Sequence, residues 1–213
     1  MSKLLNKVVK TLIISDFFLN LGWGLLSPVF ALFILEKITG SNAIKAAEVA
    51  GLAALFYWIT KSMFEIPIGY ILDKKHGEKD DFWLMVIGTF VSIIAPVGYL
   101  FSTQPWHIYL WQVIHAIGMS MSLPSWLAIF TRHIDKGKEG FQWSVETTSI
   151  GLGAGIAGGV GGVICSYFGF TTLFILVALL NFVSGICLLF IKNNIFARRD
   201  GINAIMDRPS VIP

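Results

Sequence analysis

Ionisable and amide side chains occur inside stretches of this sequence that are otherwise apolar. They are Asp16, Asn20, Lys61, Glu65, Gln112, His115 and Glu146. Such groups are costly at the depth of a bilayer, so they usually face a polar path, carry protons or neutralise one another. Carboxyl groups and histidine can exchange protons, and amides can hydrogen-bond a solute. The pattern predicts a path for a small solute, with protons as a possible coupling ion.

The apolar stretches decide the fold class. Six of them reach the length of about 20 residues that a helix needs to cross the hydrocarbon core. They run over residues 11–35, 46–72, 82–101, 106–131, 143–168 and 170–191. Hydrophobic residues make up 55% of the chain and charged residues 14%, and lipid offers the backbone no hydrogen-bond partners outside a helix. The sequence therefore predicts an all-α protein with six transmembrane helices, in contact with the lipid bilayer.

Basic residues gather in alternate connections between these stretches. Thirteen of the sixteen lysines and arginines lie at the two termini, after the second stretch or after the fourth. The opposite connections hold two, Lys37 and Lys45. By the positive-inside rule, both termini are expected in the cytoplasm, with the protein in the cell membrane. We expect a transmembrane domain over residues 1–192 and a short basic tail over residues 193–213. The formal net charge of +3 does not suggest a nucleic-acid partner.

Several of the ionisable residues have more than one interpretation. Lys61 and Glu65 are four residues apart, hence on one helix face, and they either neutralise one another or act as a protonation switch. Glu146 either pairs with Lys61 or a cytoplasmic base, or complements the positive end of its own helix. His115 either packs with a hydrogen bond or relays protons. Asp16 either lines the path or is a water-exposed residue at a helix start.

The first and fourth stretches share a spacing of a polar residue, a glycine and a proline. Asp16, Gly22 and Pro28 in the first stretch correspond, at one constant offset, to Gln112, Gly118 and Pro124 in the fourth. Transporter folds are often built from repeats that cross the membrane in opposite directions. The spacing predicts two inverted three-helix repeats.

The connection after the second stretch carries the most specific motif. Residues 69–79, Gly-Tyr-Ile-Leu-Asp-Lys-Lys-His-Gly-Glu-Lys, resemble the Gly-x-x-x-Asp-(Arg/Lys)-x-Gly-(Arg/Lys) signature of the major facilitator superfamily. That signature joins the second and third helices on the cytoplasmic side, as it would here. One residue is inserted before the second glycine, and Glu78 replaces the final basic residue. The resemblance implies a cytoplasmic gating motif made of Gly69, Asp73, Lys74 and Gly77.

In this motif, Gly69 would let a neighbouring helix approach closely, and Asp73 would accept charge-assisted hydrogen bonds from basic or helix N-terminal groups.

Two further segments resemble the same family. Residues 112–118 look like its Arg-x-x-Gln-Gly-x-Gly segment, with Gln112 in place of the arginine and His115 in place of the glutamine. The fifth stretch resembles its glycine-rich antiporter motif without the proline. Its G-x-x-x-G spacings also fit close helix packing, through Gly151, Gly155, Gly158, Gly159 and Gly162.

The resemblance covers all six stretches, which is half of a typical twelve-helix member. It implies a half-bundle of the major facilitator type that transports a small solute as a secondary transporter. Such a half would work as a homodimer or paired with another six-helix half. The alternative is a membrane assembly or scaffold subunit that keeps the fold without transport. The sequence has no nucleotide-binding, hydrolase or metal-ligand motif, so we expect neither an enzyme nor a cofactor.

Overall fold

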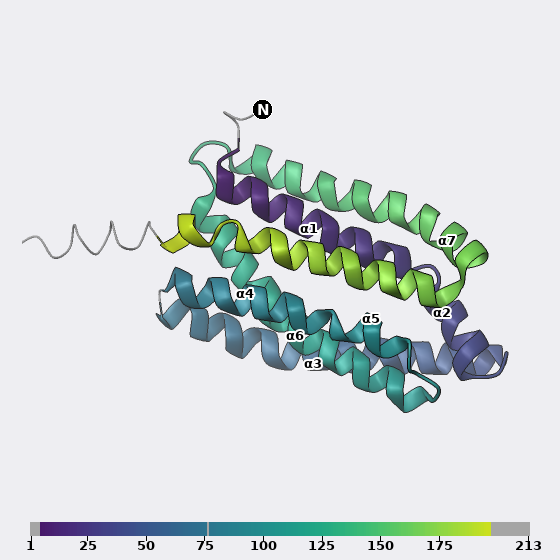
Figure 1. Ribbon diagram of the computed structural model, residues 1–213. Helices are drawn as coiled ribbons and strands as arrows, with labels where there is room; N and C mark the ends of the chain where they lie inside the picture. The colour runs from purple at the N-terminus through teal and green to yellow at the C-terminus, as the bar shows by residue number, and fades with distance from the viewer. Residues whose placement is uncertain (1–4, 76, 197–213) are drawn as a thin grey trace, which may run out of the picture.

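The computed structural model describes residues 5–75 and 77–196, which form a bundle of long helices (Figure 1). The helices are α1 (Lys7–Leu26), α2 (Phe30–Phe33), the π-helix η1 (Ile34–Ile38), α3 (Ala43–Lys75), α4 (Glu78–Ser92), α5 (Ile94–Tyr99), α6 (Pro105–His133) and α7 (Glu139–Leu189). Among the described residues, five helical units are long and apolar enough to cross a membrane, with α4 and α5 counted as one unit. The predicted all-α class is confirmed.

The helix α7 makes two crossings because it is interrupted at Gly169. This residue has φ 76° and ψ 175°, outside the helical region. Glycine adopts a positive φ without the steric penalty that a Cβ brings. Figure 1 shows the chain reversing direction at the end of the bundle, so that α7 forms two antiparallel arms. We call residues 139–168 the N-terminal arm and residues 170–189 the C-terminal arm. Together with the other units they give the six predicted crossings.

The first crossing ends earlier than the sequence predicts. An uninterrupted helix was expected over residues 11–35, but α1 ends at Leu26 and a turn separates it from α2 and η1. Pro28 lies in that turn, and a proline ring has no N–H and clashes with the preceding helical turn. The Thr39 hydroxyl donates to the Ile34 and Leu35 carbonyl groups at 3.3 and 3.2 Å, where η1 ends.

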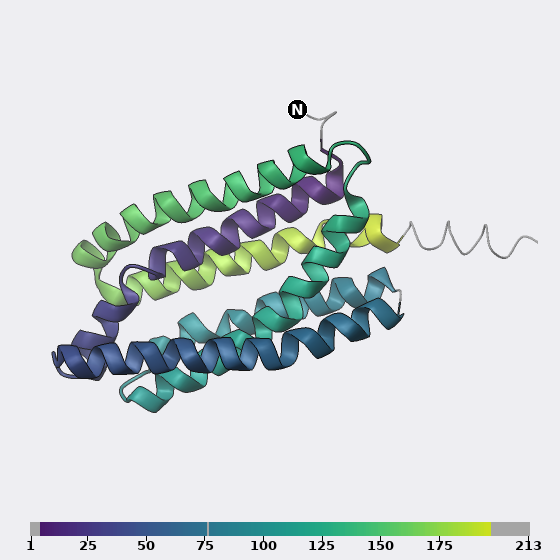
Figure 2. The same cartoon turned by 180° about the vertical axis from the view of Figure 1, so that it is seen from behind.

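The crossings are arranged as two groups of three. The helix α1 packs most extensively against α7, and α6 packs against α3 and α4; Figures 1 and 2 show the two groups side by side. Exchanging the first three crossings with the last three maps one group onto the other, as inverted repeats require. Gly22 and Gly118, which correspond in sequence, both lie at helix crossings. A Cβ there would come within 2.7 Å of Asn181 Oδ1 and of the Gly88 carbonyl oxygen, respectively. The predicted inverted repeats are confirmed.

The connections alternate between the two ends of the bundle. One end, which we call the basic end, carries the N-terminal residues of α1, the α3–α4 and α6–α7 connections and the end of the C-terminal arm (Figure 1). At this end the Asn6 side-chain amide donates to the His133 carbonyl oxygen at 2.6 Å, and Gln142 Nε2 donates to Asp135 at 2.9 Å. An ion pair joins Arg132 of α6 to the buried Asp81 of α4.

The predicted boundary between a transmembrane domain and a basic tail falls close to the last described residues. Residues 192–196 form one more helical turn, in which Ile195 is buried against the bundle. Residues 197–213, most of the predicted tail, lie outside the described residues. The boundary at residue 192 therefore stays a prediction.

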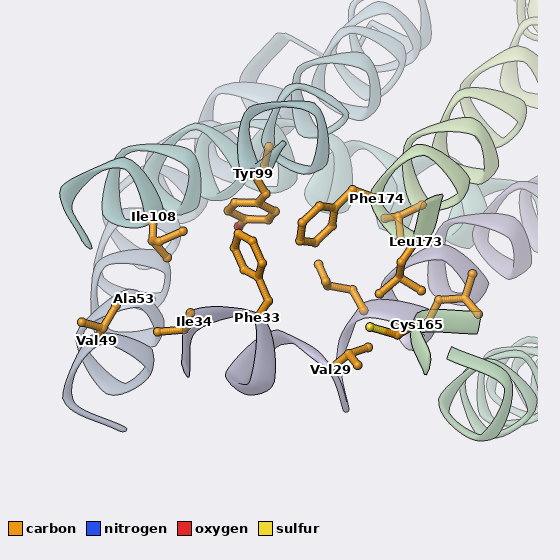
Figure 3. Packing of buried hydrophobic residues seen from close by; sticks show 14 of the residues in the cluster. Val29, Phe33, Ile34, Val49, Ala53, Tyr99, Ile108, Cys165, Leu173 and Phe174 are labelled. Carbon is orange, nitrogen blue, oxygen red and sulfur yellow. The ribbon is translucent and has the colours of Figure 1, made fainter. Parts of the chain in front are cut away.

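The core consists of two apolar clusters, one toward each end of the bundle. The cluster far from the basic end is aromatic: the Phe33 ring lies 6.4 Å from the Tyr99 ring and 4.8 Å from the Phe174 ring, between centroids (Figure 3). The cluster at the basic end contains Phe82 and Phe130. Between the clusters, buried hydroxyl groups join the helices. Ser15 Oγ donates to the Ser184 carbonyl oxygen at 3.0 Å, and the Thr89 and Ser122 hydroxyl groups are 2.9 Å apart.

The five glycines predicted to pack helices together do not do so within this chain. A Cβ added to Gly151, Gly155, Gly158, Gly159 or Gly162 would meet no atom of another helix within 4 Å. The contact with α1 is made by Gly153 and Gly161 instead. A Cβ on Gly153 would come within 3.0 Å of the Phe17 ring, and one on Gly161 would collide with the Leu25 carbonyl group. Small residues lie on two faces of this arm. Gly153 and Gly161, with Ala157 between them, face α1, and the prediction chose the face that α1 does not cover.

We expect Gly161→Ala to destabilise the protein, because its methyl group must displace the α1 backbone at Leu25. Overpacking of this kind costs about 1–3 kcal/mol. The adjacent Gly162→Ala is the matched control, since its methyl group meets open space and alanine favours a helix. Thermal unfolding of the purified variants in detergent should show a lower Tm for Gly161→Ala alone. Equal Tm values would contradict the close approach of α1 and α7.

Candidate functional site

A cavity of about 680 Å³ opens on one side of the bundle, between α1, α3 and α6. In Figure 2, α3 and the N-terminal arm of α7 lie at opposite edges of this side, with α1 and α6 between them. Its lining residues include Asp16, Leu19, Asn20, Trp23, Ser27, Phe30, Tyr57, Trp58, Lys61, Gln112, His115, Met119 and Ile150. The volume falls within the range of about 300–1,000 Å³ typical of ligand pockets.

The structure brings most of the predicted path residues together. Five of the seven line this cavity: Asp16, Asn20, Lys61, Gln112 and His115. The other two do not line it, but each interacts with a residue that does: Glu65 with Lys61, and Glu146 with Asp16. Asp16 and Gln112, which correspond in the two inverted repeats, therefore both lie in the wall of one cavity.

Two carboxyl groups meet at the α1–α7 contact. Glu146 of the N-terminal arm is 2% exposed, and its carboxyl group interacts with that of Asp16. No hydrogen bond of ordinary geometry joins either Glu146 oxygen to a described residue. Asn20 lies one turn beyond Asp16 and donates from Nδ2 to its carbonyl oxygen at 2.9 Å. Glu146 thus faces a second acid. One of the sequence interpretations proposed that it pairs with Lys61, but Lys61 pairs with Glu65.

Lys61 is neutralised within its own helix. Its Nζ lies 2.6 Å from Glu65 Oε2 one turn away, and the two side chains are 9% and 30% exposed. The ammonium group also lies 5.6 Å from the centroid of the Trp58 ring, where the negative face of the aromatic system attracts a cation. The pairing on one helix face is as the spacing predicted, and it accounts for a lysine buried in the cavity wall.

His115 is held by aromatic rings. Its imidazole stacks on Trp23 of α1, with 3.8 Å between centroids and 18° between planes, and lies 4.9 Å from the Tyr57 ring of α3. The residue is 8% exposed, and Nε2 has no hydrogen-bond partner among the described residues. The histidine therefore joins three helices through ring packing.

Sequence reasoning missed the aromatic part of the cavity. Trp23, Phe30 and Tyr57 line it, but aromatic residues are frequent throughout the apolar stretches, and periodicity does not show which face the cavity. Asn181 was also missed. It is fully buried in the C-terminal arm beside Gly22, and neither atom of its amide has a hydrogen-bond partner in the described chain.

The predicted gating motif borders a second cavity, a groove of about 430 Å³ between α3 and α6. Gly69 and Asp73 line it together with Arg132. Gly69 was expected to allow a close helix approach, but a Cβ there would meet nothing within 4 Å. Asp73 is exposed at the end of α3, and the acid that pairs with Arg132 is Asp81.

The rest of the motif forms the start of α4. Gly77 is buried and has an extended conformation immediately before the helix. Lys74 places its Nζ 4.5 Å from the centroid of the Tyr70 ring. His76 lies outside the described residues.

Comparison with known proteins gives one family and one fold. The sequence profile described as Major Facilitator Superfamily matches residues 12–203. No curated protein matches the chain. Among solved structures, the in meso crystal structure of the POT family transporter PepTSo is similar, with a TM-score of 0.74 and 14% sequence identity. The match covers 88% of this chain and 37% of that chain, so this chain spans little more than a third of the transporter's length.

The Lys61–Glu65 pair should respond asymmetrically to mutation. Glu65→Gln leaves an ammonium group that is nine-tenths buried without its partner, whereas Lys61→Met leaves a carboxylate that is 30% exposed. Breaking a buried pair costs about 3–5 kcal/mol, so Glu65→Gln should approach that cost and Lys61→Met should cost less. The double variant should recover folded protein, measured as the monodisperse yield in detergent. Equal yields of all four proteins would show that the pair has no structural role.

Proposed function

We propose that this chain, which belongs to the major facilitator superfamily, works as one half of a secondary transporter for a small solute. The observation that supports this function best is the cavity. Charged and amide groups from α1, α3 and α6 line a space of about 680 Å³ inside a membrane-embedded bundle. Apart from Lys61, which Glu65 neutralises, these groups are costly in lipid, and a polar occupant would offset that cost. In transporter folds of this kind, two bundles rock around such a site.

Pairing with a second six-helix half would complete the cavity. Only 17% of the residues in the most apolar segment of α3 are buried. The large side chains of Trp58, Met63 and Tyr70 are exposed. At the opposite edge of the cavity, the N-terminal arm of α7 carries the open glycines. A second copy placed over this side would cover both edges, and small residues let helices approach closely. A two-fold contact of identical chains is the simplest arrangement.

Proton coupling would act through the carboxyl groups of Asp16 and Glu146. Two neighbouring carboxylates in a poorly solvated site repel one another, and a proton relieves that repulsion. Because Asp16 also lines the cavity, the arrival of a solute would change the environment of the pair. Transport could thereby draw on a proton gradient, whereas facilitated diffusion would need no titratable pair.

The basic end of the bundle is proposed to face the cytoplasm of a cell membrane. This follows from the excess of lysine and arginine there. Single cysteines at Lys138 and at Gln104 test it in whole cells. A membrane-impermeant thiol reagent should label only Gln104→Cys, and labelling of Lys138→Cys alone would reverse the orientation.

Proteoliposomes that contain only this chain should take up solute when a proton gradient is imposed. A panel of a sugar, an amphiphilic cation and an organic anion provides the readout, with empty liposomes as the background. Asp16→Asn and Glu146→Gln should each abolish gradient-driven accumulation but retain exchange, which needs no net protonation. Asp80→Asn, an exposed residue outside the cavity, is the matched control. Uptake at background level for every member would favour the scaffold alternative.

Crosslinking in native membranes should reveal the paired state. In a variant without Cys165 and Cys187, a cysteine at Gly155 or Met63 should give a disulfide-linked product of twice the chain's mass. Phe182→Cys provides the control, because it is exposed on the C-terminal arm, which does not line the cavity. A crosslink through Phe182→Cys alone would place the contact on a different face.

A further inference from the structure

The charge balance of the cavity wall differs between its two sides. On the α3 side, the Lys61 ammonium group already has a carboxylate at 2.6 Å. On the α1 side, no salt bridge joins Asp16 or Glu146 to a basic residue in the part of the chain that the structure describes. The cavity wall therefore contains an acid, Asp16, without a fixed counter-ion, and its positive charge is already matched.

Unused hydrogen-bonding atoms lie around these acids. Both Glu146 oxygens lack a partner although the side chain is 2% exposed, and so does Nε2 of His115, which is 8% exposed in the cavity wall. Buried polar atoms are paired in most proteins. His115 lines the cavity, whereas Glu146 does not line it and interacts with Asp16, which does. An occupant is therefore expected to meet His115 and Asp16 directly and to act on Glu146 through Asp16.

The apolar part of the wall contains four aromatic rings. They are contributed by Trp23 of α1, Phe30 of α2, and Tyr57 and Trp58 of α3. Aromatic faces attract cations, and most strongly where water is excluded. A neutral sugar would use the Gln112 amide and the Ser27 hydroxyl group, because the Asn20 amide nitrogen already donates to the chain, and it would leave the Asp16 carboxyl group without a counter-ion. An anion would meet a lysine that has its carboxylate.

We infer that the solute is an amphiphilic organic cation, whose charge lies against the Asp16 carboxyl group, with Glu146 beside that acid, and whose apolar part lies against the rings of Trp23, Tyr57 and Trp58. This inference rests on the proposed transport function, and it names the class of substrate. Arrival of the cation at Asp16 displaces a proton from the Asp16–Glu146 pair. Solute and proton then compete for one site, which is the simplest way to couple their movements.

Two ions of nearly the same shape and opposite charge test the inference on the full chain. Binding of tetraphenylphosphonium and of tetraphenylborate is measured by equilibrium dialysis against protein in nanodiscs, with empty nanodiscs subtracted. The phosphonium should bind at least about tenfold more tightly than the borate, as expected for a charge held by buried acids. Equal binding, tighter binding of the borate or binding of neither ion would overturn the inference without any variant.

Variants then locate the site. The double replacement Asp16→Asn with Glu146→Gln should weaken phosphonium binding at least about tenfold, and Trp23→Leu should weaken it several-fold. Asp80→Asn should bind as the parent does. Unchanged binding in the double variant, checked for folding by size-exclusion chromatography, would also overturn the assignment. Binding and flux are separate readouts: cation binding without flux refutes transport, and flux with borate preference refutes the substrate class.

Discussion

Lipid supplies neither hydrogen bonds nor counter-ions, and the arrangement of this bundle follows from that shortage. Each ionisable group in the crossings must find a partner inside the protein. Lys61 does so within one helical turn, through Glu65. Asp81 pairs with Arg132 and thereby joins α4 to α6 near the basic end. Asp16 and Glu146 follow a different pattern, because the ionisable group beside each of them is a second acid. That difference distinguishes the Asp16–Glu146 pair from the two ion pairs.

Backbone contact between helices has the same origin. Apolar side chains gain nothing by leaving lipid for one another, so helices associate where their surfaces fit closely. Gly22 and Gly118 supply that fit at equivalent crossings of the two repeats, and Gly161 supplies it where α7 meets α1. The three-helix groups are therefore rigid units held at glycine positions. The cavity lies along the seam between the groups, where α1 of one faces α6 of the other and His115 stacks on Trp23.

The exposed side of the bundle has two kinds of surface that lipid alone does not explain. One is the wide uncovered face of α3, and the other is the row of glycines on α7 that meet no helix of this chain. The cavity lies between α3 and the N-terminal arm of α7, which contributes Ile150 to its lining. The proposed pairing with a second bundle would cover both surfaces. The groove lined by Gly69 lies between α3 and α6 and is open as well.

The sequence by itself determined the crossings, their alternating direction and the inverted repeat, because length, hydropathy and charge act locally along the chain. It also identified Asp16, Lys61 and His115, since a polar residue in an apolar stretch is visible without coordinates. Only the tertiary structure decided the partners. It placed Glu146 beside Asp16 and paired Arg132 with Asp81. It also showed that α1 contacts Gly161 and leaves Gly162 uncovered. These choices depend on the rotation of each helix about its axis, which packing sets and which periodicity in a uniformly apolar helix does not encode.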